Sequence, residues 1–217
     1  MKTDSTYDGR KHSNGLFIEY WTSGVIKKKG EYNQNKMVGC WEWFNQDGIL
    51  TSQKNYLNGR LDGPCITYYG NGKVFIVSNY KNGLQHGIEE WFYQEGNLSH
   101  KVEFHNGKIN GERIWYYENG EVRALEIYED GVLTDGEHKG YYSDGKIKDV
   151  VRILNGEKNG FFESFYENGN LKRRVSYENG LENGDEEWYS SDGKLTQKRT
   201  FKDENIVDLG STKNKKG

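Results

Sequence analysis

Two pairs of adjacent carboxylates are the residues of this chain best suited to acid–base chemistry. They are Glu89-Glu90 and Glu186-Glu187, and paired carboxylates can divide the roles of proton donor and proton acceptor. Both pairs occur in segments with the alternation of a β-strand, where neighbouring side chains point to opposite faces. Two carboxylates that point apart do not act on one substrate atom. We therefore interpret both pairs as solvated sheet edge, with recognition of a basic partner as the alternative.

Other catalytic and metal-binding signatures are missing from the sequence. The two cysteines, Cys40 and Cys65, fall at adjacent positions of a repeating unit and are expected on opposite faces, so we predict no disulfide between them. No G-x-S-x-G, H-E-x-x-H or G-x-x-x-x-G-K-[ST] motif occurs. We predict no catalytic residue, no metal, no cofactor and no enzyme. The histidines lack metal-ligand spacing and are interpreted as surface residues: His12, His86, His100, His105 and His138.

One unit of 24 residues recurs eight times and must position any functional side chain. Each copy begins with a glycine, numbered position 0, and a second glycine follows at position +9. Position +5 is always aromatic, +11 always aliphatic, and +17 aromatic except for Ile153. Repeats of this length are typical of stacked supersecondary units. The first glycines are Gly15, Gly39, Gly63, Gly87, Gly111, Gly136, Gly160 and Gly184.

Turn residues predict that each copy is a β-hairpin. Asn-Gly recurs, as in 118–120 and 178–180, and favours a type I′ turn because both central residues need positive φ. We expect strands near positions 1–7 and 10–18, joined to the next hairpin by four-residue links. The predicted fold is all-β, an elongated array of about eight 24-residue hairpins in one twisted antiparallel sheet of roughly 16 strands. Positions +5, +11 and +17 should form its interior face.

The repeat also predicts the domain boundaries. Residues 1–14 form a polar N-terminal segment, 15–204 a single repeat domain, and 205–217 a polar, flexible C-terminal tail. The one spacing of 25 residues precedes the copy that has Gly140 at position +4. We therefore expect the array to bend or change its curvature at residues 131–140.

Two further aromatic rows form the candidate binding site. Positions +4 and +6 share parity and oppose +5, so the predicted sheet carries aromatic side chains on both faces. These rows either pack as cross-strand ladders or lie half exposed and bind a partner, because Trp and Tyr are enriched at interface hot spots. In the second case the partner-binding residues are Trp43, Tyr69, Trp91, Tyr93, Trp115, Tyr117, Tyr142, Tyr166 and Trp188.

The recurring string G-x-W-x-x-[YF]-x-x-x-G-x-L, followed by Y-x-N-G-x-x-x-G, resembles the bacterial variant of the MORN repeat. Clear copies stand at 87–98 and 111–120, and the match covers about residues 15–201. The tryptophan, at position +4 here, is kept in only four copies. Whole chains of this kind resemble the YwqK-like antitoxin family of toxin–antitoxin systems. The resemblance implies a β-hairpin array that binds protein and has no catalytic activity.

Charge and composition narrow the class of partner. The net charge of −3 is spread over interspersed charges, which does not favour nucleic acid, and no apolar run of about 18 residues could span a membrane. The N-terminus has no apolar signal segment, so we expect a cytoplasmic protein, although a leader already removed leaves no trace. We predict a bacterial antitoxin or immunity protein that neutralises a partner toxin. The alternatives are a structural or membrane-peripheral scaffold and a glycan-binding protein.

Overall fold

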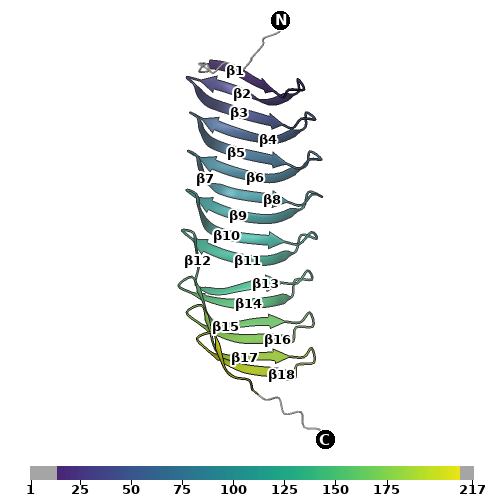
Figure 1. Cartoon of the computed structure of the whole chain (residues 1–217), viewed down its shortest axis with the longest axis vertical. Coiled ribbons are helices and arrows are strands. Elements are labelled where there is room, and N and C mark those ends of the chain that lie inside the picture. Colours follow the sequence, from purple (N-terminus) through teal and green to yellow (C-terminus); the bar gives the residue numbers. More distant parts are fainter. Residues whose placement is uncertain (1–13, 211–217) are drawn as a thin grey trace. The chain divides into compact units, whose positions relative to one another are not determined.

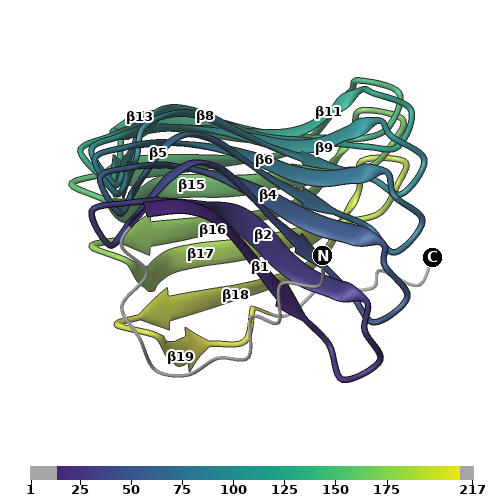
Figure 2. The same cartoon turned by 90° about the horizontal axis from the view of Figure 1, so that it is seen from above.

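The computed structural model describes residues 14–210, in which every regular element is a β-strand. The strand pairings within each part of the chain are antiparallel, and the strands twist from one to the next within each part (Figures 1 and 2). The predicted all-β fold of antiparallel hairpins is confirmed. The chain divides after Lys108 into two compact units. The repeat by itself predicts a single domain. No helix able to cross a bilayer occurs between residues 14 and 210.

The first unit is a run of consecutive antiparallel strands. β7 and β8 both pair with β6 and are one strand interrupted at His86. The strands are β1 (Asn14–Tyr20), β2 (Ile26–Asn33), β3 (Lys36–Phe44), β4 (Leu50–Leu57), β5 (Arg60–Tyr68), β6 (Val74–Lys81), β7 (Leu84–Gln85), β8 (Gly87–Phe92) and β9 (Leu98–His105).

The second unit repeats the same pattern. β12 and β13 both pair with β11. β19 pairs with β18, so the segment expected to begin a flexible tail forms a strand instead, while 1–13 and 211–217 lie outside the described residues. The strands are β10 (Lys108–Tyr116), β11 (Val122–Glu129), β12 (Val132–Leu133), β13 (Gly136–Tyr141), β14 (Ile147–Leu154), β15 (Glu157–Phe165), β16 (Leu171–Glu178), β17 (Leu181–Tyr189), β18 (Leu195–Lys202) and β19 (Asn205–Asp208).

Each repeat contains two kinds of turn, and only one is type I′. Asn82 and Gly83, at positions 19 and 20, have φ of 51° and 87°, as a type I′ turn requires. The turn at positions 7–9 is a three-residue turn in which Tyr117 N–H donates to Glu121 O and Gly120 N–H donates to Tyr117 O. Type I′ geometry predicted for 118–120 is therefore wrong. The expected four-residue links are also wrong, because the next strand begins directly after the type I′ turn.

Position +17 lies on the opposite face from +5 and +11, contrary to the prediction. Phe44 at +5 pairs directly with Leu50 at +11, whereas the ring of Tyr56 at +17 lies 6.5 Å from that of Trp43 at +4. The reason is a β-bulge: the register shifts between Trp43 and Phe44. One extra residue in β4 reverses the parity of the positions beyond it, and the same shift recurs in every hairpin.

The glycine at position 0 lies inside a strand and not at a hairpin turn. Gly63 has a φ of 97° within β5. The register between β4 and β5 shifts next to it, between Lys54 and Tyr56. A residue with a Cβ is strained at such a φ, so this second bulge requires glycine once per repeat.

The buried side chains occupy positions +2, +15 and +17 of the repeat. Position +2 pairs with +15, as Trp41 pairs with Lys54. We call the face that carries +2, +4, +15 and +17 the inner face, and the face that carries +3, +5 and +14 the outer face. The interior predicted at +5 and +11 is therefore wrong. The buried residues are Trp41, Cys65, Ser78, Glu89 and Val102 in the first unit, and His138, Ile153, Val175, Glu186 and Phe201 in the second.

The extra residue of the 25-residue spacing lies at a strand break that is one residue longer than the break at His86 in the first unit. Thr134 and Asp135 separate β12 from β13. Beyond the break Ala124 pairs with Gly140, which is the register that Ile76 and Trp91 have in the first unit. The insertion is thus absorbed within one strand, and the bend expected at 131–140 stays a prediction.

Candidate binding surface

The tryptophans at position +4 lie half-buried on the inner face. In the first unit, Trp43 lies 6.2 Å from the ring of Trp41, and the Lys54 ammonium stands 5.3 Å from the centre of the Trp43 ring. In the second unit, the Arg173 guanidinium lies 5.1 Å from the ring of Trp188. Half-exposed indoles beside cations can offer a partner both apolar area and cation–π contacts.

Trp91 is tied to a buried carboxylate. Its Nε1–H donates to Glu89 at 2.9 Å, and its ring meets that of Phe75 edge-on at 5.5 Å. Glu89 also accepts hydrogen bonds from Ser78 Oγ at 2.5 Å and Gln85 Nε2 at 2.7 Å. These three donors are uncharged. Because Glu89 is only 9% exposed, its interpretation as solvated edge is wrong.

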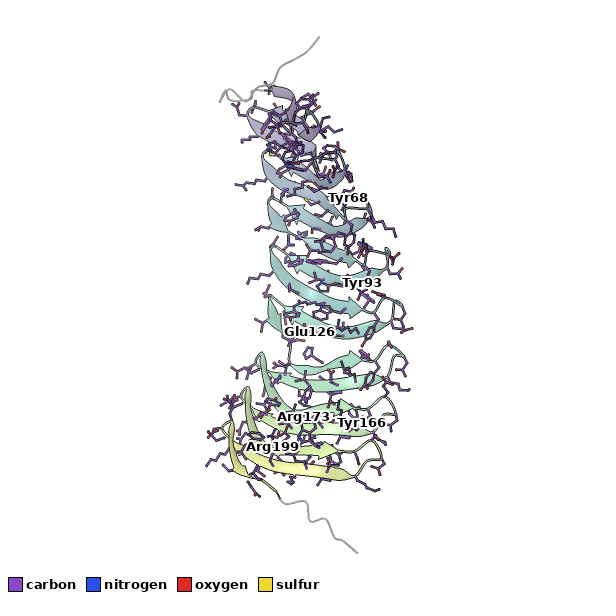
Figure 3. The ribbon with its side chains drawn as sticks, turned by 45° about the vertical axis from the view of Figure 1, so that its right-hand side comes forward. Tyr68, Tyr93, Glu126, Tyr166, Arg173 and Arg199 are labelled. Atoms are coloured by element: carbon purple, nitrogen blue, oxygen red, sulfur yellow. The ribbon has the colours of Figure 1, made fainter. Side chains whose placement is uncertain are left out.

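Five of the aromatic residues at position +6 join one repeat to the next. The hydroxyl or indole N–H donates to the backbone carbonyl of the +5 residue one copy later, as Tyr166 does in the second unit (Figure 3). These bonds tie successive hairpins together, a role that sequence reasoning missed, and any contact of the rings with a partner stays a prediction. The pairs are Trp21 to Phe44 at 3.1 Å, Tyr69 to Phe92 at 2.6 Å, Tyr117 to Tyr141 at 2.8 Å, Tyr142 to Phe165 at 2.6 Å and Tyr166 to Tyr189 at 2.8 Å.

Two copies lack this aromatic residue. Asn45 takes the place in the second copy, where its side-chain oxygen accepts N–H bonds from Asp47 and Ile49 and caps its own turn. Ser190 takes it in the eighth copy, where its hydroxyl donates to Lys194 O at 3.1 Å in its own turn. Tyr93 and Trp115 are half-buried, like the other predicted partner-binding residues.

Glu186 is the most buried charge in the described part of the chain, with no exposed surface. Arg173 Nε donates to it at 2.7 Å, and Arg199 Nε donates to its other oxygen. The two arginines lie on β16 and β18, on either side of β17 (Figure 3). Burial alone would raise the pKa of Glu186, but the hydrogen bonds from Arg199 and Arg173 outweigh burial and hold the pKa below its usual value. The solvated-edge interpretation is wrong here too.

The remaining candidate residues have ordinary structural roles. His138 is 7% exposed and its Nε2 lies 2.7 Å from Thr134 O, so it is not a surface histidine. Cys40 and Cys65 are both free. Within residues 14–210 no cluster of three or more His, Cys, Asp or Glu could hold a metal.

The run of three lysines in the first unit is neutralised by neighbouring carboxylates. Lys27 and Lys28 pair with Glu19 at 2.7 and 3.1 Å, and Lys29 pairs with Glu42 at 2.7 Å. These pairs lower the pKa of Glu19 and of Glu42, in each case mainly through the lysine hydrogen bond. The run is thus not an unpaired basic patch.

Sequence periodicity missed the most buried row because its chemistry changes from copy to copy. Position +2 carries Trp41, Cys65, Glu89, His138 and Glu186 among others. A signal was nevertheless present. Position +2 has the parity of the tryptophans at +4, so an acidic residue there lies on an aromatic face and needs donors.

Comparison with known proteins places these observations in a family. The profile described as "MORN repeat variant" matches residues 13–34, 37–58, 61–82, 85–106, 109–133, 134–151, 158–179 and 182–203. No curated protein sequence matches the chain. Among solved structures, alternansucrase in complex with isomaltononaose is 15% identical over 84% of this chain and 16% of its own, with a TM-score of 0.23, which does not indicate a shared fold. Eight matched segments span most of the sequence, and the chain therefore belongs to the MORN repeat variant family.

Proposed function

We propose that this chain is a non-enzymatic protein-binding repeat protein of the antitoxin or immunity type. It neutralises a partner protein by binding it along the inner face. MORN repeats are binding and scaffold repeats, which supports protein binding as the general activity. The role in a toxin–antitoxin system, a bacterial source and a cytoplasmic location are the specific parts of the proposal.

The observation that carries the proposal is the row of half-buried tryptophans at position +4. Trp43 and Trp188 each expose part of an indole beside a cation. Interface hot spots are enriched in Trp and Arg, which supply large buried area and directional contacts together. The tyrosines at +6 support the surface differently, because their hydroxyls hold neighbouring hairpins in register.

A membrane-peripheral scaffold is the second candidate, and the charges argue against it. A surface that binds anionic lipid needs unpaired basic clusters. The described range before residue 211 contains two runs of three basic residues. Lys27, Lys28 and Lys29 are each paired with a carboxylate. In the second run, which begins at Lys172, Arg173 and Arg174 are paired with Glu186 and Glu163. Binding through lipid headgroups would have to break these pairs.

The decisive experiment measures binding to a partner identified by cross-linking and mass spectrometry. Trp43→Ala and Trp188→Ala should each weaken binding of the purified partner about thirtyfold, as loss of a 2 kcal/mol hot spot does. Phe161→Ala on the outer face, where the ring is 47% exposed, is the matched control and should leave affinity unchanged. Co-expression of the chain should also restore growth to cells that produce the partner.

Two results would count against the proposal. If both tryptophan variants bind the partner as tightly as the native chain, the inner face is not the binding surface. If the chain sediments with anionic vesicles and rescues no growth, the scaffold replaces the antitoxin.

A further inference from the structure

The second unit contains a hollow at the strand break of the copy that has the extra residue. A space of about 440 Å³ lies where β12 stops short of β13, with Glu129, Val132 and Asp135 in its lining. Two other hollows of the same unit, beside His138, hold only about 100 and 90 Å³. We call the larger space, bounded by Glu129, Val132, Leu133, Thr134, Asp135, Asn155 and Gly156, the notch.

A backbone donor is left open at the notch. In other repeats the second residue of the type I′ turn donates its N–H to the preceding strand, as Gly131 does to Ile109 O at 2.8 Å and Gly180 does to Lys158 O at 2.9 Å. Gly156 occupies the same place but makes no such bond within the described residues. Thr134 stands where Ile109 and Lys158 stand in those copies, two residues before position 0. Its N–H donates to Ile127 O, and its carbonyl oxygen lies 2.7 Å from His138 Nε2. Gly156 is exposed, so its N–H can donate to an acceptor from outside the chain.

Charge around the notch is negative and uncompensated. Glu129, Asp130 and Asp135 form no ion pair with any described residue, while other carboxylates of this unit do, as Glu137 does with Arg152 at 2.9 Å. One oxygen of Asp135 accepts the Asn155 N–H at 2.6 Å, which holds the carboxylate at the rim.

An apolar surface lies beside these carboxylates. Val132 is 58% exposed and its Cγ1 reaches within 3.5 Å of the position that a Cβ on Gly156 would take. A methylene chain with a cationic head matches this combination, because lysine and arginine lay their stems on apolar surface while the charge stays at a polar rim.

We propose that the notch binds a lysine or arginine side chain of a partner polypeptide. The cationic head pairs with Glu129 and Asp135, the stem covers Val132, and a backbone carbonyl of the partner accepts the Gly156 N–H. The charge complementarity selects a basic partner segment. This site uses none of the tryptophans of the proposed function, so the two proposals can be tested independently.

The test is a titration of the ¹⁵N-labelled full chain with two peptides, followed by NMR. The probe is acetyl-Gly-Leu-Lys-Leu-Gly-amide, and its counterpart has Glu in place of Lys. The lysine peptide alone should give saturable shifts at the amides of Gly156 and Val132. The double variant Glu129→Gln/Asp135→Asn should bind about tenfold more weakly, while Glu112→Gln, an exposed acid of the same unit, should bind normally.

A deletion of Asp135 gives a second, independent test. It restores the 24-residue spacing, so it should close the notch, protect the Gly156 amide from exchange and abolish the peptide shifts. Absence of saturable shifts at Gly156 in the native chain overturns the proposal. Equal shifts with the glutamate peptide, or unchanged binding by the double variant, overturn it as well, and neither result affects the tryptophan test.

Discussion

The indole ring of Trp41 lies directly on the α-carbon of Gly30, on the neighbouring strand of the first unit. A Cβ atom at position 30 would overlap the ring. Trp41 has no exposed surface, and its Nε1–H donates to Glu31 O at 3.1 Å. Gly30 does not have positive φ, so packing against Trp41 and not backbone conformation requires glycine here.

Gly30→Ala should therefore destabilise the first unit by about 1–3 kcal/mol, as overpacking of a close-packed site does. Urea unfolding followed by tryptophan fluorescence measures the loss. The control is Gly70→Ala, because nothing lies within 4 Å of a Cβ there and its φ is not positive. In the double variant Gly30→Ala/Trp41→Leu the penalty should be less than the sum of the two single changes. Full additivity would mean that the two residues do not press on each other.

Tyr166→Phe should destabilise the second unit by about 1 kcal/mol, the usual net value of one hydrogen bond. The Tyr166 hydroxyl donates a hydrogen bond to Tyr189 O of the next repeat at 2.8 Å, and phenylalanine keeps the ring but removes this bond. Hydrogen exchange should show faster opening of β17 and β18. Tyr141→Phe is the control, since no hydrogen bond from that hydroxyl is recorded among residues 14–210. An equal loss in both variants would assign the effect to the ring environment.

Glu186→Gln should lower the free energy of unfolding by about 3 kcal/mol near neutral pH, because it leaves two arginines beside a buried side chain that carries no negative charge. The pKa of Glu186 is lowered in the fold, so its ionised form stabilises the protein above the unfolded pKa of about 4.3. That contribution is lost as the pH falls through the folded value. The difference in unfolding free energy between native and variant should therefore shrink below about pH 4. Glu187→Gln, on the outer face, is the control and should lose less than about 1 kcal/mol. A difference that grows in acid would contradict the arginine pairing.

Glu89→Gln should destabilise the first unit by about 1–3 kcal/mol, because the amide N–H₂ replaces one acceptor oxygen and would face the donor of either Gln85 or Trp91. Trp91 fluorescence should shift as its indole N–H loses the carboxylate. The neighbouring Glu90→Gln provides the control, since Glu90 lies on the outer face, opposite Lys101 in the strand register. Matching effects of the two substitutions would show that burial of Glu89 has no energetic consequence.

The backbone preferences of single residues determine much of the fold without any tertiary contact. The glycine spacing and the Asn-Gly pairs specify hairpins because positive φ is a property of single residues, as at Asn82 and Gly83. The all-β class and the copy number follow from the same pattern. The irregular copy was also visible in the sequence, as one spacing of 25 residues.

Only the tertiary structure decided which side chains share a face. A bulge beside Phe44 puts Leu50 and Tyr56 on opposite faces of the sheet, and counting alternate residues cannot detect the extra residue between them. The buried row was equally hidden, because its partners belong to different strands and different copies. Glu186 is acceptable at position +2 only since Arg173 and Arg199 reach it from both neighbouring strands, and Trp41 fits only over a glycine. Such pairings depend on the residues of a neighbouring hairpin, such as Arg173 for Glu186 and Gly30 for Trp41. The sequence of a single copy therefore does not reveal them.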